Sequence, residues 1–355
     1  MIVLLFHLGS CEHERRQEAE EWAASKADHD ADTCSDEQCI SDARKIDAFE
    51  KWIQSQKLAV NKLEVKSIPG FRMGTTAKDD IADGELYIAI PDHMLMGPER
   101  VEPGSRLDKK LMKIVKSQSI SMQEQRRLLS EKNKVLMYFL LQMYNPKKES
   151  FWKPYFDIMP TNLTSPIFWS EDELQELAGS EVSNMARIEK KRLRAMYDEL
   201  RERIFKHDRK TFLKQAFTLK NWFWANGLYD SRVIQLNRQT GHGNVPTFIP
   251  LIDMVNCIES QDKTFIQYDK KLRAAVMYAD RAVSRGVQVF ESYGNKSNYE
   301  YLLYNGFVME DNPNDCVYIS FPSSNARDAK SYLIKHIEEK RRGYRRFART
   351  MCIMT

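Results

Sequence analysis

Residues 250–256 read PLIDMVN, and residues 292–307 read SYGNKSNYEYLLYNGF. In the first stretch, Asp253 and Asn256 interrupt an otherwise apolar run. Buried polar groups need hydrogen-bond partners, so these two side chains either cap a turn or hold a ligand. In the second stretch, Tyr293 ends a β-rich run beside a glycine, and an amphipathic helix follows. A tyrosine at such a strand end either packs against its neighbours or projects its hydroxyl into a cleft.

Upstream of these stretches, strand-like sequence gives way to helix-like sequence. Residues 67–91 have an extended pattern, with a short β-rich run at residues 86–90 opened by a turn at Asp83-Gly84 and closed by proline. Residues 107–227 favour helix. Within them, residues 134–144 are apolar on nearly every side, which predicts a buried helix.

Two further patterns locate helices within that region. Ser170 and Glu173 form a capping-box sequence, so a helix is expected to begin there. A stripe of apolar residues at helical spacing predicts a core-facing surface, and its members are Leu193, Met196, Tyr197, Leu200 and Ile204.

Strand-like sequence returns from about residue 246. Residues 264–268 and 272–278 flank Asp269-Lys270-Lys271 and predict a hairpin, and residues 287–293 predict a further strand. Residues 327–349 revert to a basic helical pattern. A layer of strands interrupted by about 130 helical residues predicts an α+β fold with an inserted helical subdomain.

The composition is that of a globular protein. The 355 residues are 42% hydrophobic and 11% aromatic, which excludes disorder throughout, and no apolar run approaches the roughly 20 residues of a membrane-spanning helix. The net charge is +4, but residues 11–50 hold 13 acidic and 5 basic residues. We therefore expect an acidic leader before a mildly basic body. Nucleic-acid binding, which rests on that charge alone, is the least favoured reading.

The cysteines and the N-terminus bear on the compartment. No cysteine spacing is typical of a zinc site. The apolar residues 2–8 could be part of a secretory signal within residues 1–10, Cys34 and Cys39 could close a small disulfide loop, and residues 162–164 and 295–297 are glycosylation sequons. The signal lacks a basic flank, and such sequons arise by chance. We expect a cytoplasmic or nuclear protein, with the secretory pathway as the alternative.

The common catalytic motifs are absent. The sequence has no GxSxG, Walker, HExxH or strand-linked GxGxxG motif, and His242 is expected to lie in a loop rather than to act as a catalyst.

Taken together, PLIDMVN and SYGNKSNYEYLLYNGF resemble the two signature blocks of SET-domain methyltransferases. The branch resembled is the one typified by the Rubisco large-subunit lysine methyltransferase and the actin-histidine methyltransferase. Residues 150–155 (SFWKPY), with Pro160 and Trp169-Ser170, resemble the helical insert of that branch, and the block from Gly74 to Pro91 resembles its opening strands. The resemblance covers about residues 65–325.

The resemblance implies S-adenosylmethionine (AdoMet) as the methyl donor, a protein substrate, and no metal. Arg232 matches the arginine that pairs with the donor's carboxylate, and Tyr293 matches the active-site tyrosine. The other residues that match donor-contacting positions are Gly74, Asp253, Met254, Val255, Asn256, Cys257, Asn305, Gly306 and Phe307. Ile234 and Ile252 match the acceptor pocket.

The sequence departs from the branch at several positions. This sequence has Arg72-Met73-Gly74 where the branch has an opening Gly-x-Gly. It has Cys257 where the branch has a histidine, and Val287 where the branch has a glutamate. Ile234 stands where the histidine-modifying branch has an asparagine, which favours a lysine acceptor. The branch continues into a helical substrate-binding lobe, of which this chain would hold only a truncated start.

The expected organisation is therefore a SET-type α+β fold with a helical insert and a truncated C-terminal helical lobe. In chain order, the parts are residues 1–45 (acidic leader), 46–106 (N-terminal SET strands with a preceding helix), 107–228 (helical insert), 229–322 (C-terminal SET portion) and 323–355 (start of the truncated lobe). The expected function is AdoMet-dependent protein N-methylation, most readily of lysine. The alternatives are a histidine-directed enzyme and a degenerate, non-catalytic SET scaffold that binds peptides.

Overall fold

The structure is a computed structural model that describes residues 37–145, 149–238, 244–258, 266–320, 346–347 and 350–354. The apolar segment at residues 2–8, Cys34 and His242 lie outside the described residues, as does the side chain of Cys39, so the interpretations placed on them stay predictions.

The chain divides into two units. Unit 1 comprises Met1–Lys110, Leu129–Pro160 and Arg232–Ser292. Unit 2 comprises Leu111–Leu128, Thr161–Ser231 and Tyr293–Thr355. The region expected as the helical insert thus contributes residues to both units.

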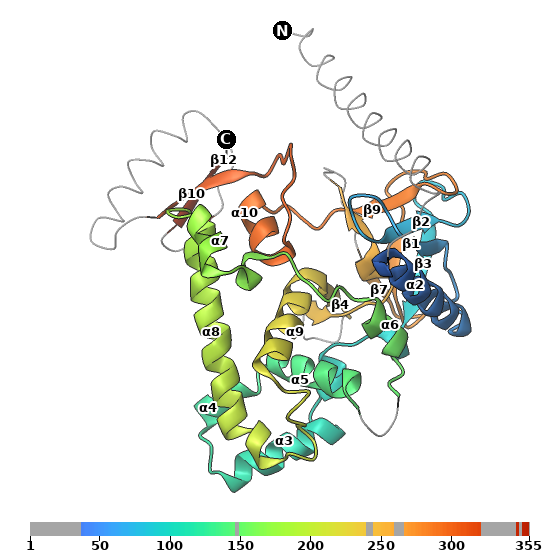
Figure 1. The fold of residues 1–355 in the computed structure, drawn as a ribbon. Helices are drawn as coiled ribbons and strands as arrows, with labels where there is room; N and C mark the ends of the chain where they lie inside the picture. Colours follow the sequence, from blue (N-terminus) through green and yellow to red (C-terminus); the bar gives the residue numbers. More distant parts are fainter. Residues whose placement is uncertain are drawn as a thin grey trace. The chain divides into compact units, whose positions relative to one another are not determined.

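The α-helices are drawn as coiled ribbons in Figure 1, and in chain order they are α2 (Glu37–Ser55), α3 (Arg106–Ser117), α4 (Met122–Leu128), α5 (Glu131–Met143), α6 (Lys153–Ile158), α7 (Glu171–Glu176), α8 (Glu181–Arg203), α9 (Leu219–Arg232) and α10 (Asn298–Glu300). The segment η6 (Tyr301–Asn305) that follows α10 is a π-helix. Among the described residues, no helix is both long enough and apolar enough to cross a membrane.

The strands, shown as arrows in Figure 1, are β1 (Leu63–Lys66), β2 (Gly74–Ala77), β3 (Leu86–Pro91), β4 (Ile234–Asn237), β5 (Asn244–Thr247), β6 (Asn256–Cys257), β7 (Ile266–Asp269), β8 (Ala274–Tyr278), β9 (Gln288–Glu291), β10 (Cys316–Ser320), β11 (Arg346–Phe347) and β12 (Thr350–Met354).

Unit 1 holds the sheets that carry most of the candidate site. One sheet has the order β1-β2-β9-β6, in which β6 pairs with β9 in parallel and the other pairs are antiparallel. Its register places Thr75 opposite Val289 and Asn256 opposite Phe290. A second sheet has the order β3-β8-β7, and β4 and β5 form a hairpin. Short strands of this kind place loops and strand ends close together.

The core of unit 1 is built from the predicted strands and the predicted buried helix. Ala89, Ala274 and Val276 form one buried cluster between β3 and β8. Phe139, on α5, is fully buried, and its ring packs 4.9 Å from that of Phe156 and 5.2 Å from that of Phe248. Helix α5 therefore occupies the core because its apolar residues cover nearly its whole circumference.

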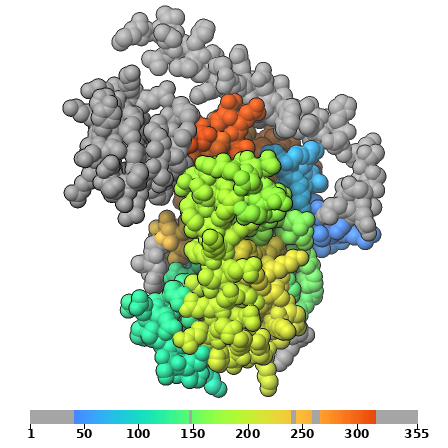
Figure 2. Space-filling model, turned by 60° about the vertical axis from the view of Figure 1, so that its left-hand side comes forward, coloured from blue at the N-terminus to red at the C-terminus, as the bar shows by residue number. Residues whose placement is uncertain are grey.

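Unit 2 is dominated by α8. Phe205, which follows this helix, is buried with its ring 4.7 Å from that of Phe217 and 5.3 Å from that of Phe212. Figure 2 shows residues from about 160 to 230, coloured green to yellow, across the middle of the view. On α8, the charged residues Lys191, Arg192 and Arg194 are exposed. The helix thus buries one stripe and leaves its opposite side in solvent, as its spacing predicts.

Several local predictions are confirmed. The buried helix expected at residues 134–144 forms as α5, and the Ser170–Glu173 capping box starts α7. Leu193, Tyr197 and Leu200 are buried on α8. The hairpin of β7 and β8 forms where it was expected, and residues 264–265 of its expected first strand lie outside the described residues.

Two predictions need correction. The strand expected at residues 287–293 is limited to Gln288–Glu291, because its pairing with β2 covers only two residues and its pairing with β6 two more. In the basic segment expected to be helical at residues 327–349, the structure describes only Arg346–Phe347, and these residues form β11. They pair with Met351 and Thr350 of β12, and this ladder supplies the hydrogen bonds that a helix would have made internally.

Candidate active site

The PLIDMVN segment makes a tight turn in unit 1. Leu251 has a φ of +73°, in the left-handed region that disfavours residues with a Cβ. The N–H of Asp253 then donates to the carbonyl of Ile249 at 3.0 Å, and a short 3-10 turn delivers the chain into β6. Such strained backbone persists only where the surrounding structure holds it, and it is concentrated at functional sites.

The carboxylate of Asp253 is completely buried in this turn. Tyr155, on α6, donates its hydroxyl hydrogen to Oδ2 of Asp253 at 2.6 Å. Arg232, the last residue of α9, lies 3.6 Å from the same oxygen and donates to the backbone carbonyl of Asp253 at 2.8 Å. The other oxygen, Oδ1, is buried without a hydrogen-bond partner among the described residues.

Burial dominates the electrostatics of this cluster. Burial raises the pKa of Asp253 to about 6, although Arg232 and Tyr155 act in the opposite direction. Burial also raises the pKa of Tyr155 well above its ordinary value, and the charge of Asp253 adds to this effect. The phenol is therefore a hydrogen-bond donor that stays protonated, and Arg232 is the cation that favours the ionised form of Asp253.

Asn256 and Gly74 meet at the end of β2. Nδ2 of Asn256 donates to the carbonyl of Met73 at 3.0 Å. A Cβ atom on residue 74 would lie 2.4 Å from that same nitrogen and 2.9 Å from Nε2 of Gln288. Only glycine allows this approach, so Gly74 is required by sterics rather than by its φ angle. The Nε2 atom of Gln288 is buried without a partner among the described residues.

The other candidate residues of unit 1 differ in exposure. Met254 and Val255 are buried, whereas Cys257 is half-buried. Of the two expected acceptor-pocket residues, Ile252 is completely buried, and Ile234 is half-buried at the first position of β4.

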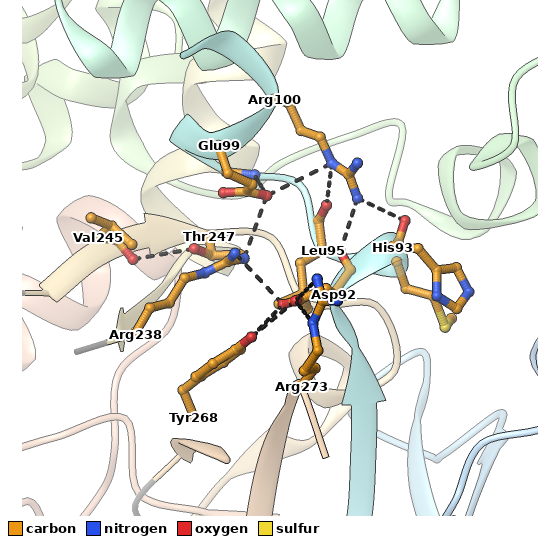
Figure 3. A network of polar contacts seen from close by, with 12 residues as sticks. Asp92, His93, Leu95, Glu99, Arg100, Arg238, Val245, Thr247, Tyr268 and Arg273 are labelled. Carbon is orange, nitrogen blue, oxygen red and sulfur yellow. Dashed lines mark hydrogen bonds and ion pairs between the residues drawn. The ribbon is translucent and has the colours of Figure 1, made fainter. Parts of the chain in front are cut away.

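The hairpin that carries Ile234 is fixed by a polar network (Figure 3). Arg238, just after β4, lies between two carboxylates, 3.7 Å from Asp92 and 3.4 Å from Glu99. Asp92 also accepts from the hydroxyl of Tyr268 at 2.9 Å and from Arg273 at 3.2 Å. Burial raises the pKa of Glu99, and Arg238 opposes this rise. The network ties the β4–β5 hairpin to β7 and to the segment after β3.

Unit 2 carries the candidate catalytic tyrosine. Tyr293 is partly exposed, and its ring lies 6.4 Å from that of Phe307 at 66°. The ammonium of Lys296 lies 5.9 Å from the Tyr293 ring and 5.6 Å from the ring of Tyr301, whose hydroxyl donates to the carbonyl of Gly294 at 2.9 Å. The ring of Tyr293 is therefore held at the edge of an aromatic group, and part of it reaches solvent.

Residues 305–307 comprise the last residue of the π-helix η6 and the two residues after it. Nδ2 of Asn305 donates to the carbonyl of Ser231 at 3.3 Å, and its Oδ1 accepts from Lys296 at 3.3 Å. Gly306 ends η6 with a φ of +82°, and a Cβ there would lie 2.3 Å from Oγ1 of Thr164. That hydroxyl donates to the carbonyl of Gly306 at 3.0 Å, so glycine is required here by both conformation and space.

The structure thus groups the predicted residues within each unit. Unit 1 brings together Gly74, Arg232 and residues 253–257, and unit 2 brings together Tyr293 and residues 305–307. Tyr155 was missed as a partner of Asp253. Its signal was a tyrosine within the apolar SFWKPY segment, because a buried phenol needs a hydrogen-bond partner. Among the described residues, no three His, Cys, Asp or Glu side chains are grouped to hold a metal ion.

The sequence has relatives of known activity, although no protein-family model matches the chain. It is 25% identical over 290 residues to the actin-histidine N-methyltransferase of Canis lupus familiaris, a match that covers 80% of this chain and 47% of the relative. It is 27% identical over 284 residues to the chloroplastic ribulose-1,5 bisphosphate carboxylase/oxygenase large subunit N-methyltransferase of Pisum sativum, covering 77% of this chain and 53% of the relative. The chain spans about half the length of these curated relatives.

Solved structures share the fold. The crystal structure of the SET domain of LSMT bound to lysine and AdoHcy matches with a TM-score of 0.67 at 21% identity, covering 88% of this chain and 67% of that one. The structure of Rubisco LSMT bound to AdoMet matches with a TM-score of 0.65 at 22% identity, and the match covers 87% of this chain and 66% of that one. The chain therefore has the α+β SET fold, and the resemblance drawn from PLIDMVN and SYGNKSN is confirmed.

Proposed function

We propose that the chain is an AdoMet-dependent protein N-methyltransferase directed at lysine. The observation that carries the proposal is the set of contacts around the PLIDMVN turn on a SET fold. There, Arg232 donates to the backbone carbonyl of Asp253. The side chain of Asn256 donates to the carbonyl of Met73 and lies in the space that a Cβ atom at Gly74 would fill. The match to relatives that methylate proteins supports the same conclusion.

The residues of unit 1 fit the chemical groups of the donor. Arg232 uses Nη1 for its contacts with Asp253 and Met254, and within the described part of the chain its Nε and Nη2 have no hydrogen-bond partner. These free donors suit the carboxylate of the donor's methionine part, because guanidinium pairs with carboxylates in a two-pronged geometry. The carboxylate of Asp253 is completely buried, so its part in the proposed site is to hold Arg232 and the turn in place.

Tyr293 is proposed as the catalytic residue of unit 2. The donor supplies a methyl group on a sulfonium sulfur, which passes to the acceptor nitrogen as the sulfur–carbon bond breaks and the nitrogen–carbon bond forms. The hydroxyl of Tyr293 would accept weak C–H···O contacts from that methyl group and so orient it. Alignment of this kind can supply several kcal/mol of a barrier, about 7–11 kcal/mol in well-oriented intramolecular reactions.

The acceptor is proposed to be lysine because Ile234 is apolar. An apolar channel disfavours the ammonium form of lysine, whose ordinary pKa is about 10.4, and so favours the neutral amine that attacks. A histidine-directed enzyme is the second candidate, and the 25% identity to an actin-histidine N-methyltransferase favours it. Methylation of lysine-only and histidine-only peptide sets, read by mass spectrometry, distinguishes the two.

Calorimetry with AdoMet tests the proposal most directly. The wild type is expected to bind AdoMet and to transfer labelled methyl groups to protein substrates. Tyr293→Phe is expected to keep donor binding and to lose most of the transfer. Tyr304→Phe, on the neighbouring π-helix, is the matched control and should transfer like the wild type. Absence of binding heat would reject the proposal. Equal transfer by the wild type and Tyr293→Phe would instead favour the non-catalytic scaffold.

A further inference from the structure

Arg72 stands where the resemblance leads us to expect a glycine, and its backbone has the conformation that glycine favours. Its φ is +63°, in the left-handed region. Its carbonyl accepts from Oγ of Ser67 at 3.2 Å and from the N–H of Ile68 at 3.3 Å. The loop before β2 thus keeps a glycine-like turn although an arginine occupies it.

The side chain of Arg72 points to helix α2 and to the end of α6. Its Nε and Nη2 donate to the two carboxylate oxygens of Asp42, each at 3.1 Å, which is a bidentate ion pair. Its Nη1 donates to the carbonyl of Ile158 at 3.3 Å. The side chain of Asp42 is only 10% exposed and that of Arg72 is 33% exposed, so water screens this pair incompletely.

The same loop touches the candidate donor residues of unit 1. The residue after Arg72 is Met73, whose carbonyl accepts from Asn256 at 3.0 Å. Ile158 ends α6, the helix that carries Tyr155 to Asp253. A shift of Arg72 would therefore move the backbone atom that holds Asn256 and loosen the end of α6.

We propose that Asp42 is a positioning residue for methyl-donor binding that acts through Arg72, an inference that rests on the proposed function. Asp42 neutralises the guanidinium and holds it against α2. Without Asp42, the guanidinium of Arg72 would remain in the loop without a carboxylate partner. The residues beside this loop are the ones proposed to receive the donor, which carries a sulfonium cation. The two positive charges would repel each other strongly, because water is partly excluded there. The ion pair allows arginine to stand at a position that suits glycine, and it ties the loop before β2 to α2.

A rescue experiment separates this role from a general effect on folding. The variants are Asp42→Ala, Arg72→Gly, the double variant, and Asp47→Ala as control, since Asp47 lies on the same helix in an exposed ion pair with Lys51. AdoMet affinity is measured by calorimetry. Asp42→Ala is expected to weaken binding about tenfold, the effect of losing a charge-assisted contact. Arg72→Gly and the double variant should bind within about threefold of the wild type, because glycine removes the unpaired cation.

Amide hydrogen exchange of residues 67–74 without donor supplies an independent reading. Asp42→Ala is expected to speed exchange there, whereas Asp47→Ala should leave it unchanged. The inference is overturned if Asp42→Ala behaves like Asp47→Ala in both measurements, or if the double variant binds as weakly as Asp42→Ala. If the wild type gives no heat with AdoMet, the proposed function fails, and the exchange data still decide whether Asp42 orders the loop.

Discussion

The hydroxyl of Tyr155 lies 2.6 Å from Oδ2 of Asp253, although 98 residues separate them along the chain. This hydrogen bond joins helix α6 to the turn that precedes β6. It is buried at both ends, so no water can replace it if one partner is lost.

Tyr155→Phe should therefore destabilise the protein by about 1–3 kcal/mol, the cost of leaving a buried acceptor unsatisfied. It should also raise the pKa of Asp253 further, because one of the groups that lower it is gone. Urea unfolding followed by circular dichroism measures the change. Tyr278→Phe is the control, since Tyr278 is exposed on β8. Equal stability of the two variants would contradict the assigned role of Tyr155.

Asp253→Asn should change how stability depends on pH. The pKa of Asp253 is about 6 in the folded protein, above the ordinary 3.8, so the folded state binds its proton more tightly than the unfolded state does. This group therefore favours folding at low pH, and its contribution is lost as the pH rises from about 4 to about 6.

Above about pH 6, the lost contribution amounts to about 3 kcal/mol. The stability of Asp253→Asn relative to the wild type should rise across this window and then level off. Unfolding free energies measured at intervals of pH test this expectation. A difference that does not vary with pH would show that the pKa of Asp253 is the same in the folded and unfolded chains.

Gly74→Ala should lower the free energy of unfolding by about 1–3 kcal/mol, because the added methyl group would clash with Nδ2 of Asn256. Shortening the asparagine removes that clash. The double variant Gly74→Ala/Asn256→Ala should therefore cost less than the sum of the two single changes. Chemical denaturation of the four proteins gives the coupling energy. Strict additivity would mean that the backbone moves apart instead.

Arg238→Gln and Arg273→Gln form a matched pair, since both arginines contact Asp92. The side chain of Arg238 is 13% exposed and that of Arg273 is 78% exposed. Removing Arg238 leaves two carboxylates without their buried cation and should cost about 3 kcal/mol, whereas removing Arg273 should cost about 1 kcal/mol or less. Thermal and urea unfolding measure both variants. A larger loss of stability in Arg273→Gln than in Arg238→Gln would contradict the expectation that the buried arginine matters more.

Local signals accounted for much of the fold. The apolar circumference of residues 134–144, the capping box at Ser170 and the Asp269-Lys270-Lys271 turn each depend on neighbours within a few residues, and each forms as expected. The helix expected at residues 327–349 was wrong for Arg346–Phe347, the only part of it that the structure describes, because these two residues pair with β12. Strand pairing depends on which neighbour a segment meets in the fold, and helical periodicity does not encode this.

The site was predictable only in part. The resemblance singled out Arg232, Asn256 and Tyr293 as residues of a donor and active site. It predicted none of the contacts that these residues make within the chain. The partnerships of Asp253 with Tyr155 and of Arg72 with Asp42 join residues far apart in sequence. No spacing rule predicts such pairs, since they depend on how the elements pack.

The hydroxyl of Thr164 belongs to a glycosylation sequon that begins at Asn162, and in the folded chain it is committed to the carbonyl of Gly306. The second sequon ends in Ser297, which is almost completely buried and caps the helix that follows. Oligosaccharide transfer at Asn295 would therefore have to precede folding. A glycan at Asn162 would instead place a bulky sugar chain two residues from the support of Gly306. In a secreted form of the chain, the sequon at Asn162 would thus place a glycan beside the contact that supports residues 305–307.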